Sequence, residues 1–329
     1  MENVFEIRKV SQSDITALAA LYEQVWPNVS FDKLEKVNFV LKESTGVSYC
    51  AIKEGEIVGS RTSFFMPAYY GERKLNCVQF ADSCVRKDCR RQGLFLKMNQ
   101  AFLDGFFKEQ PGELIYNISV DASRSAYEKL GWNYIKSLHG ITKYPHFLRL
   151  LFKIGFDIRK LKGAPKFDSK TEVQPLPVSL FDVRDEFFSL TKTIHIKYSA
   201  EIFNWRIKSG NGIKVFLEDS LGAVVYKIGK KPSGISYLSI GEVFLAEYKY
   251  NNFKKLMDIL VNKLNVDSIG ATITLGHPLL PFYNKYGLKV INRVSAYLNH
   301  GVRVETEEMK EICYNPNNWA LSMLDIDTF

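Results

Sequence analysis

Strand and helix patterns alternate over the first 137 residues, and their order restricts the possible fold more than any other feature of the chain. Strand patterns cover residues 5–10, 47–54, 57–70, 75–86, 113–120 and 132–138. Helical patterns cover residues 15–26, 30–44, 93–109 and 123–130. The strands at 47–86 follow one another through short turns and predict an antiparallel meander. The order β-α-α-β-β-β-α-β-α-β predicts an α/β fold (α+β, with a mixed sheet).

The composition is that of a folded protein with two domains. At about 150 residues per domain, a chain of 329 residues favours two. Hydrophobic residues make up 46% and charged residues 24%, which excludes collagen-like and disordered chains. No apolar run reaches the length of a membrane span, and the N-terminus has no signal-peptide core, so we expect a cytoplasmic protein.

Five cysteines, an odd number with no Cys-x-x-Cys pair, predict reduced thiols without a disulfide and without zinc. Lysine and arginine exceed aspartate and glutamate by 44 − 36 = +8, with a pI near 9.0. This charge favours an anionic partner such as nucleic acid, an acidic membrane surface or a phosphate-bearing small molecule. Because no nucleic-acid-binding motif is present, we expect no nucleic acid as a partner.

The middle of the chain predicts a boundary. Residues 141–163 form a basic amphipathic pattern, which fits either a packed connecting helix with a solvated basic side or a helix on a membrane, and we favour the first. Residues 163–178 are polar and contain proline, as in a linker. We therefore predict domains at 1–162 and 179–329, joined by a linker at 163–178.

A short internal repeat suggests that the second domain is a diverged copy of the first. Tyr127 and Tyr283 each open a Tyr-x-Lys-x-Gly motif, 283 − 127 = 156 residues apart. A helical run and a strand precede each copy, although a chance similarity stays open because Tyr-x-x-x-Gly is common at helix ends.

The segment from Val85 to Phe95 has the character of an anion-binding turn. It joins a strand to a helix and places Gly93 after basic residues, where free backbone N–H groups and the helix dipole can hold a pyrophosphate. The chain has neither a Gly-x-x-x-x-Gly-Lys-Ser/Thr nor a Gly-x-Gly-x-x-Gly loop, so another phosphate ligand is required.

Val85-x-x-x-x-Arg90-x-x-Gly93, followed by Tyr127-Glu-Lys-Leu-Gly131-Trp132, resembles the coenzyme A site of the GCN5-related N-acetyltransferase (GNAT) superfamily. The resemblance covers about residues 3–137. It implies a GNAT fold in the N-terminal domain, a diverged GNAT-like C-terminal domain, and an N-acyltransferase that uses acyl-coenzyme A as co-substrate and no metal. Phe95 and Val120 depart from the family pattern, which has a small residue and often an asparagine at these positions.

The resemblance also implies roles for individual residues. It assigns the pyrophosphate to Arg90, Arg91, Gln92, Gly93, Leu94 and Phe95. The pantetheine arm would lie against Cys84, Val85 and Asn117. Tyr127 would stand near the thioester sulphur and act as general acid.

The general base is less defined. The family's usual base positions hold Gln79 and Ala81, neither of which can accept a proton. Asp82 is the nearest carboxylate, but strand alternation directs it to the other face of the sheet unless a bulge intervenes, and a structural carboxylate is the alternative. A weakly basic amine held against the thioester could also react without a base.

Near residue 246, which is 90 + 156, the second domain has no glycine loop, so we expect coenzyme A in the first domain only and the acceptor site at the domain junction. Phe-Asn-Trp205-Arg206 and Trp319 followed by Asp325-x-Asp resemble two-domain GNAT members of bacterial surface-polysaccharide pathways, which acylate amino sugars. This resemblance implies that Trp205, Arg206 and Trp319 bind the acceptor.

The acceptor is then a small-molecule amine, with a dTDP- or UDP-linked deoxyamino sugar favoured. An aminoglycoside, a polyamine or a lysine is the alternative, and so is a catalytically silent coenzyme A-binding module. His277 fits a turn or core position better than a ligand.

Overall fold

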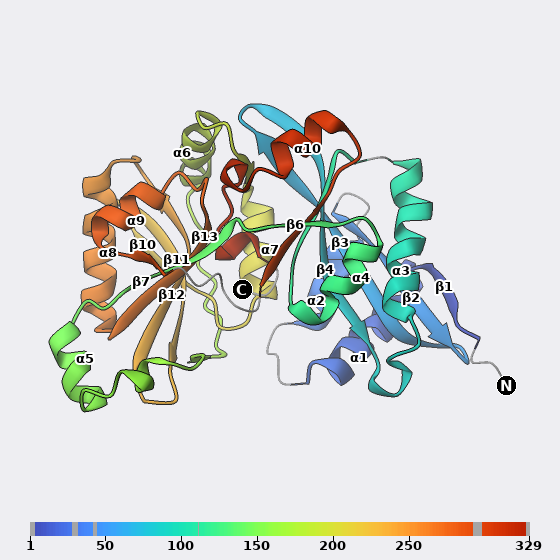
Figure 1. Ribbon diagram of the computed structural model, residues 1–329, viewed down its shortest axis with the longest axis horizontal. Coiled ribbons are helices and arrows are strands. Elements are labelled where there is room, and N and C mark those ends of the chain that lie inside the picture. Colours follow the sequence, from blue (N-terminus) through green and yellow to red (C-terminus); the bar gives the residue numbers. More distant parts are fainter. Residues whose placement is uncertain (1–3, 28–31, 42–44, 111, 292–297, 327–329) are drawn as a thin grey trace. The chain divides into compact units, whose positions relative to one another are not determined.

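The computed structural model describes residues 4–27, 32–41, 45–110, 112–291 and 298–326 (Figure 1). The chain divides into two compact units, each built from separate stretches of sequence. Unit 1 comprises Met1–Ala68, Lys74–Lys136 and Tyr297–Asn315. Unit 2 comprises Tyr69–Arg73, Ser137–Ala296 and Pro316–Phe329.

Unit 1 contains a mixed sheet with the strand order β1-β2-β3-β4-β5-β15-β6. Its strands are β1 (Glu6–Lys9), β2 (Gly46–Lys53), β3 (Glu56–Tyr70, whose last two residues belong to unit 2), β4 (Arg73–Val85), β5 (Leu114–Ser119), β6 (Asn133–Ile135) and β15 (Asn299–Arg303). Its helices are α1 (Ile15–Val25), α2 (Lys33–Leu41), α3 (Leu94–Phe102), α4 (Asp121–Lys129) and α10 (Glu307–Cys313). The order of elements up to β6 is the one that the sequence predicts.

The two faces of this sheet carry different layers. Leu18 and Tyr22 of α1 pack with Cys50 and Cys84 of the sheet on one face. Phe102 and the α4 residue Tyr127 pack with Phe80 and other residues on the opposite face. Helices therefore cover both sides of the unit 1 sheet, and the end of β4 lies between them.

Strands β4 and β5 run parallel but pair over a short distance only. The pairing begins at Cys77 and Leu114 and ends at Gln79 and Tyr116. Strand β4 continues to Val85, whereas β5 continues beside β15 on its other edge. The described parts of β4 and β5 thus separate at the level where the sequence places the pantetheine arm.

Unit 2 repeats this sheet with the order β10-β11-β12-β13-β7-β14. The strands of this sheet are β7 (Leu138–Lys143), β8 (Lys166–Phe167), β10 (Lys214–Glu218), β11 (Gly222–Lys230), β12 (Ser236–Leu245), β13 (Ser268–Thr274) and β14 (Lys289–Ile291). The short strand β9 (Ile194–Ile196) pairs with β3 instead. The helices of unit 2 are α5 (Phe147–Ile154), α6 (Val178–Ser189), α7 (Ala200–Ser209), α8 (Tyr250–Leu264) and α9 (Leu280–Tyr286). Figure 1 shows α8 and α9 together on one side of this sheet, where Phe253 and Tyr283 pack into the core.

The internal repeat extends to individual hydrogen bonds. The N–H of Trp132 donates to the carbonyl of Tyr127 at 3.1 Å, and the N–H of Leu288 donates to the carbonyl of Tyr283 at 3.0 Å. Gly131 and Gly287 have φ angles of 88° and 95° at the same place in each copy. The predicted α/β class with a mixed sheet is therefore confirmed, and the two copies of the motif have the same local structure.

The two units exchange one strand, and this exchange corrects the expected boundary at residue 162. Strand β7, expected in the first domain, pairs with β13 and β14 of unit 2. Strand β15, expected in the second domain, pairs with β5 and β6 of unit 1. The physical reason is that strand pairing is set by tertiary partners, such as the unit 2 core around Ile141, and not by the local pattern.

The expected helix and linker between the domains also differ from the structure. Helix α5 spans only eight residues of the 141–163 segment, which begins within β7. The expected linker at 163–178 contains β8, which pairs with the β11 residues Gly229 and Lys230. Among the described residues, no helix is both long enough and apolar enough to cross a membrane.

Candidate functional site

The turn between β4 and α3 adopts the conformation expected of an anion-binding loop. Arg91 and Gly93 have φ angles of 63° and 73°, and α3 begins at Leu94. Left-handed residues on both sides of Gln92 turn successive backbone N–H groups toward one side, which is the geometry of a backbone nest. The first N–H groups of α3 have no intrahelical partner, so they extend this set of donors.

Gly93 is required by its backbone conformation and not by lack of space. A Cβ atom at Gly93 would have no neighbour within 4 Å, whereas a φ of 73° is costly for any residue with a side chain. The open space above Gly93 leaves room for a phosphate group to approach the backbone.

Arginine side chains tie this loop to the end of β4. The Nε of Arg90 donates to the carbonyl of Val85 at 3.0 Å. Arg86 forms ion pairs with Glu56 and Asp88, each at 2.8 Å. Arg90 and Arg91 are exposed, so their charges are available to an anion at the loop.

The equivalent turn of unit 2 has a different structure. Residues 246–249 join β12 to α8, and all four are described without a positive φ. Glu247 places a carboxylate in this turn and forms an ion pair with Lys249. The anion-binding geometry is thus a feature of unit 1.

Tyr127 is buried beside a buried arginine that the sequence reasoning missed. The side chain of Arg61, on β3, lies 3.9 Å from the ring centroid of Phe80 and 5.6 Å from that of Tyr127. Arg61 is only 2% exposed. A charged residue in the middle of the predicted strand 57–70 was the signal that could have identified it, because an arginine is rarely fully buried without a role.

The surroundings of Tyr127 hold its hydroxyl in the protonated form. Burial raises the pKa of Tyr127, while Arg61 and Asn117 oppose this shift. Phe95, the departure from the family pattern, packs edge-on against the Tyr127 ring at 5.1 Å. The bulky Phe95 therefore positions the Tyr127 ring in addition to contributing a backbone N–H to α3.

Asn117 is a buried polar side chain beside Tyr127, whose pKa burial raises and Asn117 lowers. It is 1% exposed, and neither its Nδ2 nor its Oδ1 makes a hydrogen bond. Gly301 of β15 lies against it, because a Cβ there would contact the Asn117 Oδ1. An unpaired buried amide is costly unless a ligand satisfies it, and amide groups of a pantetheine arm would do so. The residues present therefore fit coenzyme A.

Asp82 lies on the α1–α2 side of the sheet because β4 is irregular at this residue. Its φ of 41° interrupts the alternation of the strand. Val78 and Phe80, before the irregularity, face the α3–α4 side, whereas Cys84, after it, packs with Tyr22. Asp82 therefore lies on the same face of the sheet as Gln79 and Ala81.

The carboxylate of Asp82 is engaged in a buried ion pair. The Nζ of Lys36, on α2, lies 2.8 Å from the Asp82 Oδ1, and the two side chains are 3% and 7% exposed. A buried ammonium that loses its counter-ion is strongly destabilising. This geometry favours a structural role for Asp82 over that of a general base.

Cys84 and Val85 complete the end of β4. The thiol of Cys84 points into the α1 core, and burial raises its pKa, so only its backbone faces the separated strands. All five cysteines are buried, and none of them forms a disulfide. Among the described residues, no group of three His, Cys, Asp or Glu side chains could hold a metal ion.

The acceptor residues expected from the sequence are buried within unit 2. Trp205 and Arg206 of α7 are 5% and 4% exposed, with the guanidinium 4.8 Å from the indole ring. Trp319 is fully buried, and its carbonyl accepts a hydrogen bond from Thr274. His277 is buried 3.7 Å from Glu242, as expected for a core histidine.

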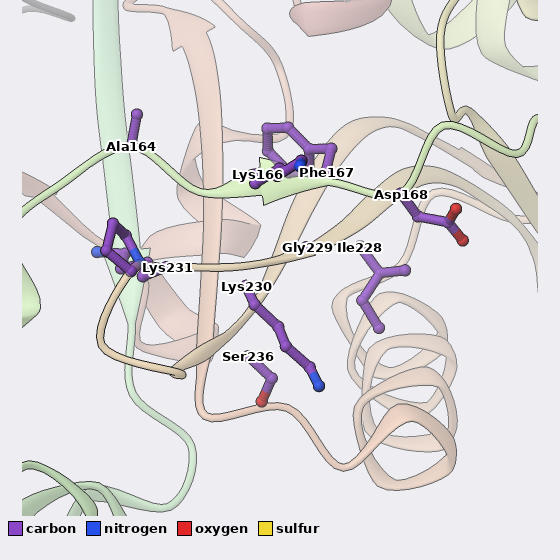
Figure 2. Close-up of a pocket in the computed structure, with 10 residues that line it drawn as sticks. Ala164, Lys166, Phe167, Asp168, Ile228, Gly229, Lys230, Lys231 and Ser236 are labelled. Atoms are coloured by element: carbon purple, nitrogen blue, oxygen red, sulfur yellow. The ribbon is translucent and has the colours of Figure 1, made fainter. Parts of the chain in front are cut away.

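Unit 2 also contains a pocket of about 680 Å³. Figure 2 shows that its lining comes from two stretches of chain, residues 164–168 and residues 228–236. Lys166, Lys230 and Lys231 contribute the basic side chains of this pocket. None of the sequence-predicted site residues lines it.

Comparisons with known proteins agree with this fold. Residues 6–135 match the family model described as the acetyltransferase (GNAT) domain. The solved GCN5-related N-acetyltransferase from Anabaena variabilis ATCC 29413 has a TM-score of 0.63 at 14% identity, over 92% of this chain and 73% of that chain. The enzyme of the same description from Kribbella flavida has a TM-score of 0.61 at 10% identity, over 92% and 72%.

A protein from Enterococcus faecalis V583, described as a probable N-acyltransferase, has a TM-score of 0.58 at 11% identity, over 94% of this chain and 74% of that chain. At these identities the solved structures establish the fold. No curated protein matches the chain.

Proposed function

We propose that this acyl-coenzyme A-dependent N-acyltransferase, which carries a GNAT acetyltransferase domain at residues 6–135, acylates the amine of a deoxyamino sugar linked to a nucleotide diphosphate. The observation that carries the proposal is the loop with left-handed residues at Arg91 and Gly93, which opens α3 in the same unit as the buried Tyr127.

The cofactor-binding residues follow from that loop. The backbone N–H groups of Arg91, Gln92, Gly93, Leu94 and Phe95 would hold the pyrophosphate, with Arg90 adding charge. The side-chain amide of Asn117 would form hydrogen bonds with the pantetheine arm, which would lie beside Cys84 and Val85. When bound, acyl-coenzyme A supplies an activated acyl thioester. The protein contributes position and charge, which can supply much of the acceleration.

Tyr127 is proposed to hold a proton for the departing sulphur. Its raised pKa keeps the hydroxyl protonated at neutral pH, which is the state that a general acid needs. The Arg61 guanidinium would then stabilise negative charge on the phenol oxygen after the proton has left. Such a proton transfer contributes about 10²–10⁴-fold in rate.

Unit 2 is proposed to bind the acceptor. Its β12–α8 turn lacks the left-handed residues of the cofactor loop, and the net charge of +8 favours an anionic nucleotide sugar over a cationic amine. Trp205, Arg206 and Trp319 stay proposed as contacts of the acceptor, although all three side chains are buried in unit 2. The buried cysteines, none of which forms a disulfide, agree with a reducing compartment, and the proposal places the reaction in the cytoplasm.

Release of free thiol from acetyl-coenzyme A, measured against a panel of amines, tests the proposal. The panel contains dTDP- and UDP-linked amino sugars, an aminoglycoside, a polyamine and a lysine peptide. The nucleotide amino sugars are expected to give the highest kcat/KM. A higher kcat/KM with a cationic amine would contradict the acceptor but keep the enzyme class, and no turnover with any amine would support the silent-module alternative.

A further inference from the structure

Large apolar side chains are concentrated on the surface of unit 2 in and after α5. Five of the twelve exposed large hydrophobic residues in the described part of the chain fall within twelve consecutive positions. We call them the α5 patch: Phe147, Leu148, Phe152, Phe156 and Ile158, which are 54%, 72%, 73%, 63% and 69% exposed. Contiguous exposed apolar surface of this kind marks interaction sites in folded proteins.

The patch is held in place by a second, buried face of the same helix. Leu150 and Ile154 are fully buried against Ile235. Leu148 and Phe152 are one turn apart and lie on a different face. In Figure 1, α5 lies at the end of the unit 2 sheet opposite α6. The helix is thus anchored through one face while another remains exposed.

The backbone after α5 keeps a third aromatic ring in the patch. Gly155 and Phe156 have φ angles of 59° and 60°, which is unfavourable for a bulky residue such as phenylalanine. The N–H of Phe156 donates to the carbonyl of Leu151 at 3.0 Å. The rings of Phe152 and Phe156 then meet edge-on, 5.7 Å apart. The fold thus accepts backbone strain at a residue whose ring stays exposed.

Basic residues surround the patch. Between residues 146 and 166 the only acidic residue is Asp157, so this stretch has a net charge of +5. Its basic residues are Arg149, Lys153, Arg159, Lys160, Lys162 and Lys166.

Three contacts connect this segment to the rest of unit 2. Arg149 and Lys153 pair with Asp267 at 3.0 and 2.6 Å and remain 41% and 40% exposed. The Nζ of Lys231 donates to the carbonyl of Leu161 at 2.7 Å, which places the lysine-bearing β11–β12 turn and its pocket (Figure 2) beside this segment.

We propose that the α5 patch docks on an anionic lipid bilayer, with its aromatic and aliphatic side chains in the headgroup layer and the basic residues on lipid phosphates. Apolar residues next to a cluster of lysines and arginines suit an interface that is apolar within and negatively charged at its surface. A helix of eight residues can lie in such an interface. This docking does not depend on the identity of the acceptor.

Sedimentation of the full chain with vesicles tests the proposal. Vesicles of equal parts phosphatidylcholine and phosphatidylglycerol are compared with vesicles of phosphatidylcholine alone, at low and high salt. The wild-type protein is expected to bind the anionic vesicles, and to bind them less at high salt. Replacing Lys160 and Lys162 by glutamine is expected to weaken binding by about fivefold per lysine.

Phe152→Glu is expected to lower the bound fraction at least about tenfold, because it removes an inserted ring and adds a charge that the lipid repels. The matched control is Leu190→Glu, at an 81% exposed leucine outside the patch, which is expected to bind like the wild type. Circular dichroism of each variant checks folding, and the lysine variants carry the test if Phe152→Glu does not fold.

Three results would overturn the proposal. The first is that the wild type does not bind anionic vesicles. The second is that folded Phe152→Glu and the lysine variants bind like the wild type. The third is that the wild type forms a dimer that Phe152→Glu abolishes while vesicle binding is absent, which would assign the patch to a second copy of the chain.

Discussion

At the scale of single residues, the site depends on buried polar groups whose partners lie far away in sequence. Arg61 packs on Phe80 and beside Tyr127, and Lys36 pairs with Asp82. Each of these contacts places a charge in an environment that excludes water, where it acts more strongly than at the surface. The two predictions at this scale separate catalytic from structural roles.

Tyr127→Phe is expected to lower kcat by about 10²-fold and to change coenzyme A affinity by less than about twofold, because only the proton donor is lost. Tyr134→Phe is the matched control, since its half-buried hydroxyl lies 3.4 Å from that of Ser119 and has no assigned role. Burial raises the pKa of Tyr127 above 10.0, so its hydroxyl stays protonated below that pH. The wild-type kcat should therefore not decrease through deprotonation of Tyr127 below pH 10.0. Steady-state kinetics with direct binding measurements check both, and an unchanged kcat would remove Tyr127 from the mechanism.

Asp82→Asn is expected to lower the free energy of unfolding by about 3 kcal/mol or more, because it leaves the Lys36 ammonium buried without its counter-ion. Adding Lys36→Met should restore most of the stability and, if Asp82 is structural, the activity as well. The free energy of unfolding, measured with denaturant, and the kcat of the double variant decide whether Asp82 has a structural or a catalytic role. A stable but inactive double variant would instead establish Asp82 as the general base.

At the scale of secondary-structure elements, the sequence predicted which segments are strands and helices, but not their irregularities. The order of elements from β1 to β6 follows from periodicity and turn residues, which are local properties. The left-handed conformation of Asp82 and the short β4–β5 pairing depend on packing, so no local sequence pattern predicts them. The loop at Arg91 and Gly93 was accessible because a glycine after basic residues at a strand-to-helix turn is itself a local signal.

In unit 2, a fully buried ion pair joins α6 to β12. The Nη2 of Arg184 lies 2.9 Å from the Oε2 of Glu242, and neither side chain is exposed. Burial alone would raise the pKa of Glu242, but Arg184 and His277 outweigh it and the pKa is about 2, below the ordinary 4.5. This pair therefore contributes stability above about pH 4.5 that is lost as the pH falls toward 2.

Glu242→Gln is expected to lower the free energy of unfolding at pH 7 by about 3 kcal/mol, because buried Arg184 loses the carboxylate at 2.9 Å and keeps only the more distant Asp185 at 3.7 Å. The difference from the wild type should shrink as the pH falls from 4.5 toward 2. Glu247→Gln, at an exposed position of the same unit, is the control. Urea unfolding across this pH range checks the prediction, and a difference that stays constant with pH would contradict it.

At the scale of the whole molecule, each unit needs a strand from the other half of the chain. Strand β15 lies between β5 and β6, and β7 lies between β13 and β14. The sequence predicted two related domains but not this exchange, because the pairing partner of a strand depends on tertiary contacts and not on its local pattern. The identity of the partner is set only when both sheets form.

The exchange predicts reciprocal effects of two mutations. Val302 of β15 and Ile141 of β7 are 0% and 1% exposed. Val302→Ala should destabilise unit 1 by about 2 kcal/mol and speed amide hydrogen exchange in β5, while Ile141→Ala should do the same in β13 of unit 2. Hydrogen exchange with peptide resolution measures this. If the two halves of the chain formed separate consecutive domains, Val302→Ala would speed hydrogen exchange only in unit 2 and Ile141→Ala only in unit 1. That result would contradict the exchange of strands.

The most direct test of the account is the affinity of coenzyme A for Gly93→Ala, measured by titration calorimetry beside the control Gly234→Ala. The two glycines have φ angles of 73° and 79°, and a Cβ at either one meets no atom within 4 Å, so the substitutions carry the same backbone strain. If the Arg91–Phe95 loop binds the pyrophosphate, Gly93→Ala should weaken binding about 5- to 30-fold and Gly234→Ala should leave it unchanged. Equal affinities for the two variants would contradict the assignment of the coenzyme A site.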